Sequence, residues 1–568
     1  MMRTMGNRSL ALCLGILVAG ACAVPPALAA DDAKLEGTYK LILVPPLQEL
    51  DFLVVNVTNE DGKPSAKVQK AQPLFPSAPS VVKFAIKGDR VSFAMKLEGS
   101  EHPFAGTLDK SGDVLGTLQL QGNTLPARLE KAPDGQLKPF GIDAKLSRAY
   151  VAAKQEKDPK VQSSKLSDLL KETGDSPKSD ILFADLVAQG ESADLTEDQV
   201  RGHVTKWLAI AKPYGETYTS SVQAKIGKAL AGQKKYAGLA FELATAADKA
   251  LAADASIESR ATVARNLADA ARLAGKAEIA ATAEAKATGL EKSLDDEYRK
   301  TVPPFEPTKF VGRKDSKATR VVVMELFTGA ECPPCVAADV GFDALIHSFK
   351  PTELIALQYH LHVPGPDPLT NADSVARADY YPDIQGTPSV FLNGKSFAGG
   401  GGPMAASKAK YAEYSDAVTK ELDGKKAATI DLKVNRSGDD IKISATASAT
   451  DAKPEAKLKL RLAVIEEEIR YQGGNRLRLH HHVVRAFPGG VEGQALTEGK
   501  GTVETTVKVS TLRQDVEKYL SNFARTNGSF ASRPPIALDK LSVVAFVQDD
   551  SDKTILHAVQ IPVADAKP

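Results

Sequence analysis

The chain has 568 residues, which is too long for a single hydrophobic core and predicts about three to five domains. Its 72 lysines and arginines nearly balance its 71 aspartates and glutamates, and this balance argues against a nucleic acid or another polyanion as partner. We therefore expect a multidomain protein whose function resides in local motifs.

Residues 1–30 are typical of an export signal. Arg3 and Arg8 give the segment a basic start, and residues 10–21 form an apolar run that is too short to span a bilayer. Small residues at Ala27 and Ala29 then offer a cleavage site. The mature protein is therefore expected to be periplasmic or extracellular.

The signal segment also contains Cys22, and this cysteine leaves a second interpretation open. The small residues 19–21 precede it, as in lipoproteins whose acylated cysteine anchors the chain to a membrane. This interpretation ranks second, because alanine is a weak match three residues before such a cysteine. Cleavage at the later site removes Cys13 and Cys22, so that only Cys332 and Cys335 remain in a compartment where disulfides persist.

Residues 31–143 are predicted to form an antiparallel β domain, either a barrel or a sandwich. Turn signals at residues 87–89, 110–112 and 121–123 separate short runs in which apolar and polar residues alternate. These runs are residues 52–57, 81–86, 91–97 and 114–120. No polar residues converge in this pattern, which favours a structural module.

Residues 144–300 change in composition to alanine, lysine, glutamate and leucine with helical spacing, which predicts an α-helical domain. A weak repeat starts at Leu230 and again at Leu273, and resembles stacked helical hairpins of the tetratricopeptide type. Such a domain binds a partner or acts as a spacer, and the sequence leaves both open. Three prolines within residues 301–318 then indicate an extended linker.

Residues 319–425 contain the remaining cysteine pair, Cys332 and Cys335. Residues 320–327 are rich in β-branched and apolar side chains, which predicts a buried strand, and apolar residues recur at helical spacing over residues 336–349. A helix is therefore expected to begin at or near Cys332. The unsatisfied backbone N–H groups and the positive dipole end at a helix start favour thiolate over thiol.

A second strand is predicted over residues 354–363. Further along, Thr387 and Pro388 precede an apolar run that ends in Asn393 and Gly394, a dipeptide that favours a tight hairpin turn. This order of strand, cysteine pair at a helix start, strand and Thr-Pro before a hairpin resembles the thioredoxin fold. Among its members, the chain looks most similar to exported bacterial proteins of the TlpA/ResA type or a related secreted group.

The resemblance implies an exported thiol–disulfide oxidoreductase that acts on protein thiols and disulfides, with an upstream redox partner and no cofactor besides its redox-active disulfide. In this family the more exposed cysteine, here Cys332, attacks, and Cys335 resolves the mixed disulfide. It also implies a cis peptide bond at Pro388, which faces the cysteines and leaves the backbone of Thr387 free for a substrate segment. The buried acid of the family has no match at its usual spacing, and Glu325, one position earlier, is the candidate for it.

Two pairs of histidines are candidate metal ligands. His360 and His362 share one face of a predicted strand and, with the cysteine pair, could hold copper or zinc. His480 and His482 share a face within a run of three histidines. A hydrogen-bonded surface pair or a strand edge is the more common arrangement, so we prefer an interpretation without metal.

Residues 426–568 return to alternating runs, whose number and spacing predict a separate immunoglobulin-like β-sandwich. These runs are residues 430–434, 441–445, 458–464, 503–509 and 541–547. The alternative to an oxidoreductase is a secreted protein that keeps the thioredoxin-like fold without catalysis, and binds a partner or holds copper or zinc.

Overall fold

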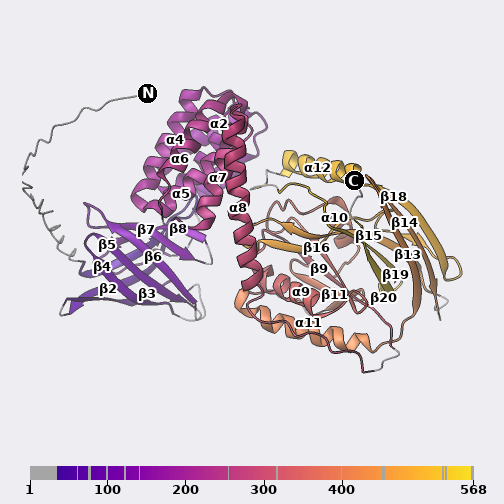
Figure 1. The fold of residues 1–568 in the computed structure, drawn as a ribbon. Helices are drawn as coiled ribbons and strands as arrows, with labels where there is room; N and C mark the ends of the chain where they lie inside the picture. Colours follow the sequence, from indigo (N-terminus) through magenta and orange to yellow (C-terminus); the bar gives the residue numbers. More distant parts are fainter. Residues whose placement is uncertain are drawn as a thin grey trace, which may run out of the picture. The chain divides into compact units, whose positions relative to one another are not determined.

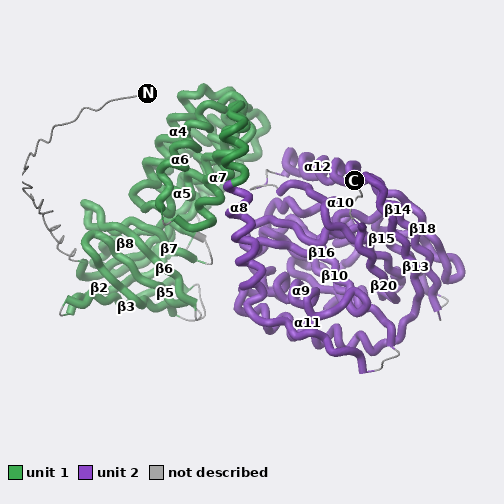
Figure 2. The backbone as a smooth tube through the Cα atoms, viewed as in Figure 1, with its two compact units in different colours: residues 1–285 green, residues 286–568 purple. Residues whose placement is uncertain are grey.

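The structure is a computed structural model (Figure 1). It describes residues 35–60, 62–73, 78–97, 100–120, 123–139, 141, 143–253, 255–314, 318–397, 399–450, 455–527, 530 and 534–564. The predicted export signal, with Cys13 and Cys22, lies outside the described residues. The chain divides into two compact units, residues 1–285 and residues 286–568 (Figure 2).

The first unit begins with an antiparallel sheet, as the sequence predicts for residues 31–143. Its strands are β1 (Gly37–Leu43), β2 (Leu50–Glu60), β3 (Lys63–Ala71), β4 (Ser80–Lys87), β5 (Arg90–Leu97), β6 (Ser100–Leu108), β7 (Val114–Leu120) and β8 (Asn123–Lys131). The order β3-β2-β1-β8-β7-β6-β5-β4 pairs the first strand with the last and gives a barrel-like sheet. Apolar side chains such as Leu41, Phe93 and Phe104 form its core, and the rings of Phe93 and Phe104 stack 4.6 Å apart.

A helical region follows, and the prediction of helices over residues 144–300 is confirmed. Its helices are α1 (Ala144–Lys154), α2 (Pro159–Thr173), α3 (Asp180–Ala188), α4 (Glu197–Ala211), α5 (Glu216–Leu230), α6 (Ala237–Ala250), α7 (Ile257–Leu273) and α8 (Ala277–Thr301). Their core contains Trp207, which stacks on Phe183 and donates a hydrogen bond to Asp180 Oδ1 at 2.7 Å. No described helix has both the length and the apolar character needed to cross a membrane.

The second unit contains a mixed sheet of nine strands. They are β9 (Val322–Thr328), β10 (Leu354–His360), β11 (Ser389–Leu392), β12 (Lys395–Phe397), β15 (Leu458–Arg470), β16 (Leu479–Ala486), β17 (Gln494–Ala495), β19 (Leu541–Asp549) and β20 (Ile555–Pro562). The order is β12-β11-β9-β10-β16-β15-β19-β20, with β17 paired to β15. β9, β10 and β16 run parallel, whereas β11 is antiparallel to β9.

This sheet corrects the expectation of a separate sandwich over residues 426–568. β15, β16, β19 and β20 belong to the same sheet as the strands that flank the cysteines, while β13 (Ala428–Ser437), β14 (Asp440–Ala449) and β18 (Lys500–Lys508) form a second, antiparallel sheet. Alternation predicts that a segment is a strand and which side chains are buried, but it does not identify the neighbouring strand. The sequence pattern therefore does not predict that β10 pairs with β16.

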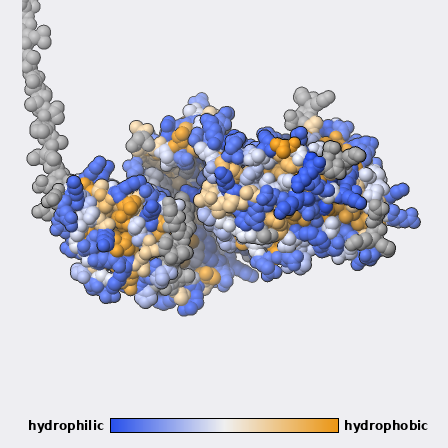
Figure 3. Space-filling view, turned by 90° about the horizontal axis from the view of Figure 1, so that it is seen from below, coloured by the Kyte–Doolittle hydropathy of each residue, from blue (hydrophilic) through white to orange (hydrophobic). Residues whose placement is uncertain are grey.

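Helices and the smaller sheet cover both faces of the mixed sheet. α10 (Ala372–Asp379) packs on one face. On the other, α9 (Val336–Ser348) and α11 (Ser407–Leu422) cover β9 and β10, while α12 (Val509–Asn527) and the three-stranded sheet cover β15 and β19. Polar side chains dominate the face shown in Figure 3, with smaller apolar patches between them.

Candidate redox site

Cys332 and Cys335 form a disulfide between β9 and α9. A single 3₁₀ turn, Pro333–Cys335, connects them, and α9 begins only at Val336. The helical segment therefore begins directly after Cys332, close to the position that the sequence predicts. Prolines fit the first positions of such a turn because their missing N–H groups would have no partner there. Cys332 thus precedes the helix, and Cys335 is its N-cap residue.

Thr387 and Pro388 lie beside the disulfide. The hydroxyl of Thr387 donates to Cys332 Sγ at 3.4 Å, and the Thr387–Pro388 peptide bond is cis, as the resemblance implies. Cys332 is only 1% exposed and Cys335 is 0% exposed, so neither sulfur is open to solvent. The structure therefore brings together four predicted site residues, but it does not show the exposed Cys332 that the resemblance implies.

The loop before Cys332 is held by segments that are distant in the sequence. Asp367 Oδ2 accepts a hydrogen bond from the Ala330 N–H at 2.6 Å, and the Asn475 N–H donates to the Ala330 carbonyl at 2.9 Å. The hydroxyl of Tyr471 donates to Glu331 Oε1 at 2.7 Å. Tyr471 and Asn475 lie between β15 and β16, which the sequence analysis assigned to another domain. No local motif distinguishes them, so sequence reasoning missed them.

Glu325, the predicted buried acid, lies on the wrong face of β9 for this role. Met324 and Leu326 pack against α9 and α11, whereas Val323 and Phe327 belong to the core on the opposite face. Side chains alternate along a strand, so Glu325 faces away from α9. The prediction that Glu325 relays protons to the cysteines is therefore wrong.

Glu325 instead forms a fully buried ion pair with Arg377, and both residues are 0% exposed. Arg377 Nε and Nη2 donate to the two carboxylate oxygens at 2.8 and 3.0 Å. The hydroxyls of Tyr359 and Tyr381 donate to the same carboxylate at 3.0 and 2.6 Å. A bidentate ion pair with two further hydrogen bonds to the carboxylate makes this buried negative charge tolerable.

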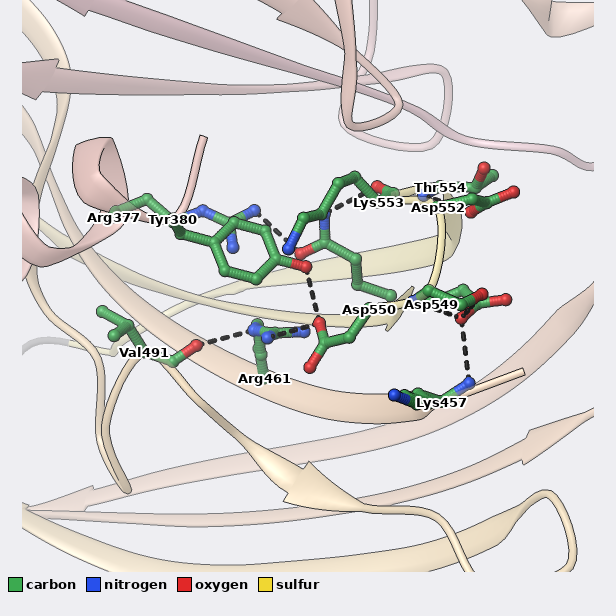
Figure 4. A network of polar contacts seen from close by, with 12 residues as sticks. Arg377, Tyr380, Lys457, Arg461, Val491, Asp549, Asp550, Asp552, Lys553 and Thr554 are labelled. Carbon is green, nitrogen blue, oxygen red and sulfur yellow. Dashed lines mark hydrogen bonds and ion pairs between the residues drawn. The ribbon is translucent and has the colours of Figure 1, made fainter. Parts of the chain in front are cut away.

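The network continues around Tyr380, at the end of α10 (Figure 4). The guanidinium groups of Arg377 and Arg461 lie 4.7 and 4.9 Å from the ring centroid of Tyr380, and Lys553 Nζ lies 3.6 Å from it. Asp550 Oδ1 accepts hydrogen bonds from the Tyr380 hydroxyl at 2.5 Å and from Arg461 at 2.8 Å. These contacts connect α10 to β15 and to the turn after β19. The role of this network is therefore structural.

Asp339 is a buried carboxyl group on the cysteine side of the sheet. It lies on α9 four residues after Cys335 and is 1% exposed. Gln358 Nε2 donates to its Oδ1 at 3.3 Å. Burial, helped by the nearby carboxylates of Asp343 and Asp367, raises the pKa of Asp339 well above its usual range. Its signal in the sequence is an acid in an otherwise apolar helix start, one turn after the second cysteine.

The four histidines that are candidate metal ligands all contact protein groups. His362, His480 and His482 contact the Tyr519 hydroxyl, the Tyr471 carbonyl and the Ala356 carbonyl, respectively. His360 contacts Asp367 at 2.9 Å and Gln358 at 3.2 Å. Within the described ranges, no group of three or more histidine, cysteine, aspartate and glutamate side chains is arranged to hold a metal ion.

Comparisons with known proteins add little. No family model matches the chain, and no curated protein matches it. The structure of HBP35 of Porphyromonas gingivalis is 18% identical over 45% of this chain and 78% of that chain, with a TM-score of 0.30. A β-glucosidase from Kluyveromyces marxianus in complex with glucose is 12% identical over 40% of this chain and 28% of that chain, with a TM-score of 0.13.

Replacing Arg377 by methionine should destabilise the second unit by about 3–5 kcal/mol, because it leaves the Glu325 carboxylate buried without its partner. The measurement is hydrogen exchange of β9 and β10 amides at increasing urea concentration, since the one tryptophan, Trp207, lies in the other unit. The control is Lys433→Met, which removes an exposed ion pair with Asp431 and should cost less than about 1 kcal/mol. Equal effects of the two substitutions would contradict the assigned role of Arg377.

The stability of the second unit should also fall as the pH rises from about 7 to about 10. His481 lies 3.0 Å from Asp343 and 3.7 Å from Glu468. Burial lowers its pKa, but the two carboxylates outweigh burial and raise the pKa to about 10. Because this exceeds the unfolded value of about 6.5, the stabilisation is complete below about pH 6.5 and is lost as the pH approaches 10.

Urea unfolding at several pH values tests this dependence. His481→Gln should reduce the loss of stability of the second unit between pH 7 and pH 10, which is about the range over which His481 loses its proton. His362→Gln should keep the wild-type slope, because burial lowers the pKa of His362 to about 4 and this side chain stays neutral throughout the range. A wild-type slope in His481→Gln would show that another group is responsible.

Proposed function

We propose that the protein is an exported thiol–disulfide oxidoreductase with a thioredoxin-like redox domain. The observation that carries the proposal is the disulfide between Cys332 and Cys335 at the start of α9, with the Thr387–Pro388 cis peptide beside it. The sequence of the first thirty residues supports export. The protein substrates would exchange electrons with this one cysteine pair, without a further cofactor.

The exchange proceeds in two displacements. A substrate thiolate attacks Cys332 Sγ, the bond between Cys332 and Cys335 breaks, and Cys335 leaves as a thiolate that takes up a proton. A second substrate thiolate then attacks the mixed disulfide and releases Cys332. The substrate leaves as a disulfide, and two electrons and two protons have passed to the cysteine pair. In reverse, the same steps reduce a substrate disulfide.

The surroundings of Cys332 favour the disulfide over the thiolate. Pro333 and Pro334 offer no N–H group to stabilise a negative sulfur. The Thr387 hydroxyl donates to Cys332 Sγ at 3.4 Å and stabilises a thiolate at this position. A neutral donor at 3.4 Å stabilises a thiolate only weakly. Since a stabilised thiolate makes such a site more oxidising, we infer that this pair is a weak oxidant.

We propose that Asp339 exchanges a proton with Cys335. Cα–Cβ bonds in a helix tilt towards its N-terminus, so a side chain four residues further on lies over the turn that carries Cys335. The raised pKa of Asp339 lets it hold a proton at a pH where an exposed aspartate has lost it. Asp339 can therefore take up the proton when Cys335 attacks, and return it when Cys335 leaves.

Two cysteine substitutions test the proposed function. Cys332→Ser should abolish exchange, because it removes the sulfur that forms the mixed disulfide. Cys335→Ser should accumulate mixed disulfides, because it removes the thiol that resolves them. Insulin reduction measures the exchange, and nonreducing gel electrophoresis detects the trapped species. Retention of exchange in both variants would refute the redox function.

Asp339→Asn should slow exchange by at least about tenfold without loss of stability at neutral pH. The raised pKa means that ionisation of Asp339 destabilises the folded state as the pH rises, and asparagine removes this effect while it can still accept from Gln358. The control is Asp343→Asn, one turn further along α9, which should lower stability through the loss of its ion pair with His481. A wild-type pH profile of exchange in Asp339→Asn would contradict the assignment.

A further inference from the structure

Four consecutive glycines, Gly399–Gly402, lie next to the disulfide, and we call this segment the glycine strap. The Gly402 N–H donates to the Pro334 carbonyl at 2.7 Å, and the Ala337 N–H donates to the Gly402 carbonyl at 2.9 Å. Ala337 lies in the first turn of α9, where N–H groups have no partner within the helix. The strap therefore caps α9 through its backbone.

Packing shows how closely the strap approaches the site. A Cβ atom added to Gly401 would lie 1.6 Å from the Pro334 carbonyl oxygen and 3.2 Å from Pro388 Cδ. The first distance excludes any side chain at this position. At Gly399 the nearest atom, the Pro388 oxygen, would lie at an ordinary 3.7 Å. The strap thus contacts both Pro334, which lies between the two cysteines, and Pro388, which lies beside the disulfide.

Burial of Cys332 gives this contact a functional consequence. A thiolate must approach Cys332 Sγ along the disulfide bond, and a cysteine residue that is only 1% exposed offers no such path. Two segments lie beside the cysteine turn, the glycine strap and the loop that contains Tyr471 and Asn475. Side-chain hydrogen bonds hold that loop in place. The strap has no side chains of its own; Lys410 Nζ donates to the Gly399 carbonyl at 3.3 Å, and two backbone hydrogen bonds to Pro334 and Ala337 connect the strap to the cysteine turn.

We propose that the glycine strap closes the disulfide to small thiols and is displaced by an extended polypeptide segment of the substrate. When the strap leaves, the Pro334 carbonyl and the Ala337 N–H lose their partners, which costs free energy where they stay buried. An extended peptide supplies both a donor and an acceptor from its backbone, as in strand addition, whereas a small thiol supplies neither. The substrate class rests on the proposed function, while closure by the strap does not.

Reduction of the oxidised protein by dithiothreitol tests the closure. One thiolate of the reagent attacks Cys332 Sγ and Cys335 leaves, and the second then closes the cyclic disulfide and frees Cys332, so that two electrons and two protons pass to the protein. Gly401→Ala should accelerate this reaction at least about tenfold, because the new methyl group prevents the strap from seating on Pro334. Gly399→Ala, the matched control, should stay within about twofold of wild type. Equal rates in all three proteins would overturn the proposal.

Hydrogen exchange of the wild-type protein gives an independent test should Gly401→Ala fail to fold. If the strap opens by itself, the amides of Gly402 and Ala337 exchange faster than the amide of Phe342, which is buried further along α9. A single common rate for the three amides would mean that the strap opens only with the whole unit, and would overturn the proposal.

A comparison of two disulfides tests the substrate class. The reduced wild-type protein should react faster with insulin than with hydroxyethyl disulfide, which has no peptide backbone. Gly401→Ala should lower the ratio of the insulin rate to the hydroxyethyl disulfide rate. An equal ratio in the two proteins would refute the polypeptide preference. A lack of reaction with insulin in every variant, together with faster reduction of Gly401→Ala by dithiothreitol, would refute the proposed function and leave the closure standing.

Discussion

The parallel pairing of β10 with β16 is the constraint on which the rest of the second unit depends. It joins the strands around the cysteines to the strands of the C-terminal region in one sheet. The segment that leads into β16 is thereby placed against the loop before Cys332, where Tyr471 contacts Glu331 and Asn475 contacts Ala330. The backbone pairing of β10 with β16 therefore fixes the geometry of the loop that carries the disulfide.

The mixed sheet also separates two kinds of buried carboxyl group. On the face that α10 covers, Glu325 accepts four hydrogen bonds, two of them from Arg377, and its charge is compensated. On the face that α9 covers, Asp339 lies among other acids, and its pKa is raised. A compensated carboxylate stabilises packing, whereas a carboxyl group with a raised pKa can exchange a proton. The two residues are thus suited to different roles, and their positions on opposite faces keep those roles apart.

Local sequence patterns were sufficient for some of the site but not for all of it. The cysteine spacing and the Thr387–Pro388 dipeptide are short-range features, and both residues of the dipeptide lie beside the disulfide. Glu325 was assigned to the cysteine side by its spacing to the cysteines, and along a strand an error of one position moves a side chain to the opposite face. Asp339 follows the second cysteine by one helical turn, and an acid in this apolar context could have been noticed.

By itself, the sequence determined that the chain contains an antiparallel β region, a helical region and a cysteine pair before a helix, because strand alternation, helical periodicity and turn residues act over a few neighbouring positions. Only the tertiary structure decided that both cysteines are buried, that the glycine strap lies on Pro334, and that the C-terminal strands join the sheet of the site. The physical reason is that burial and hydrogen bonding depend on which segments meet in space. Tyr471 and Glu331 are 140 residues apart in the chain, and no local pattern encodes their contact.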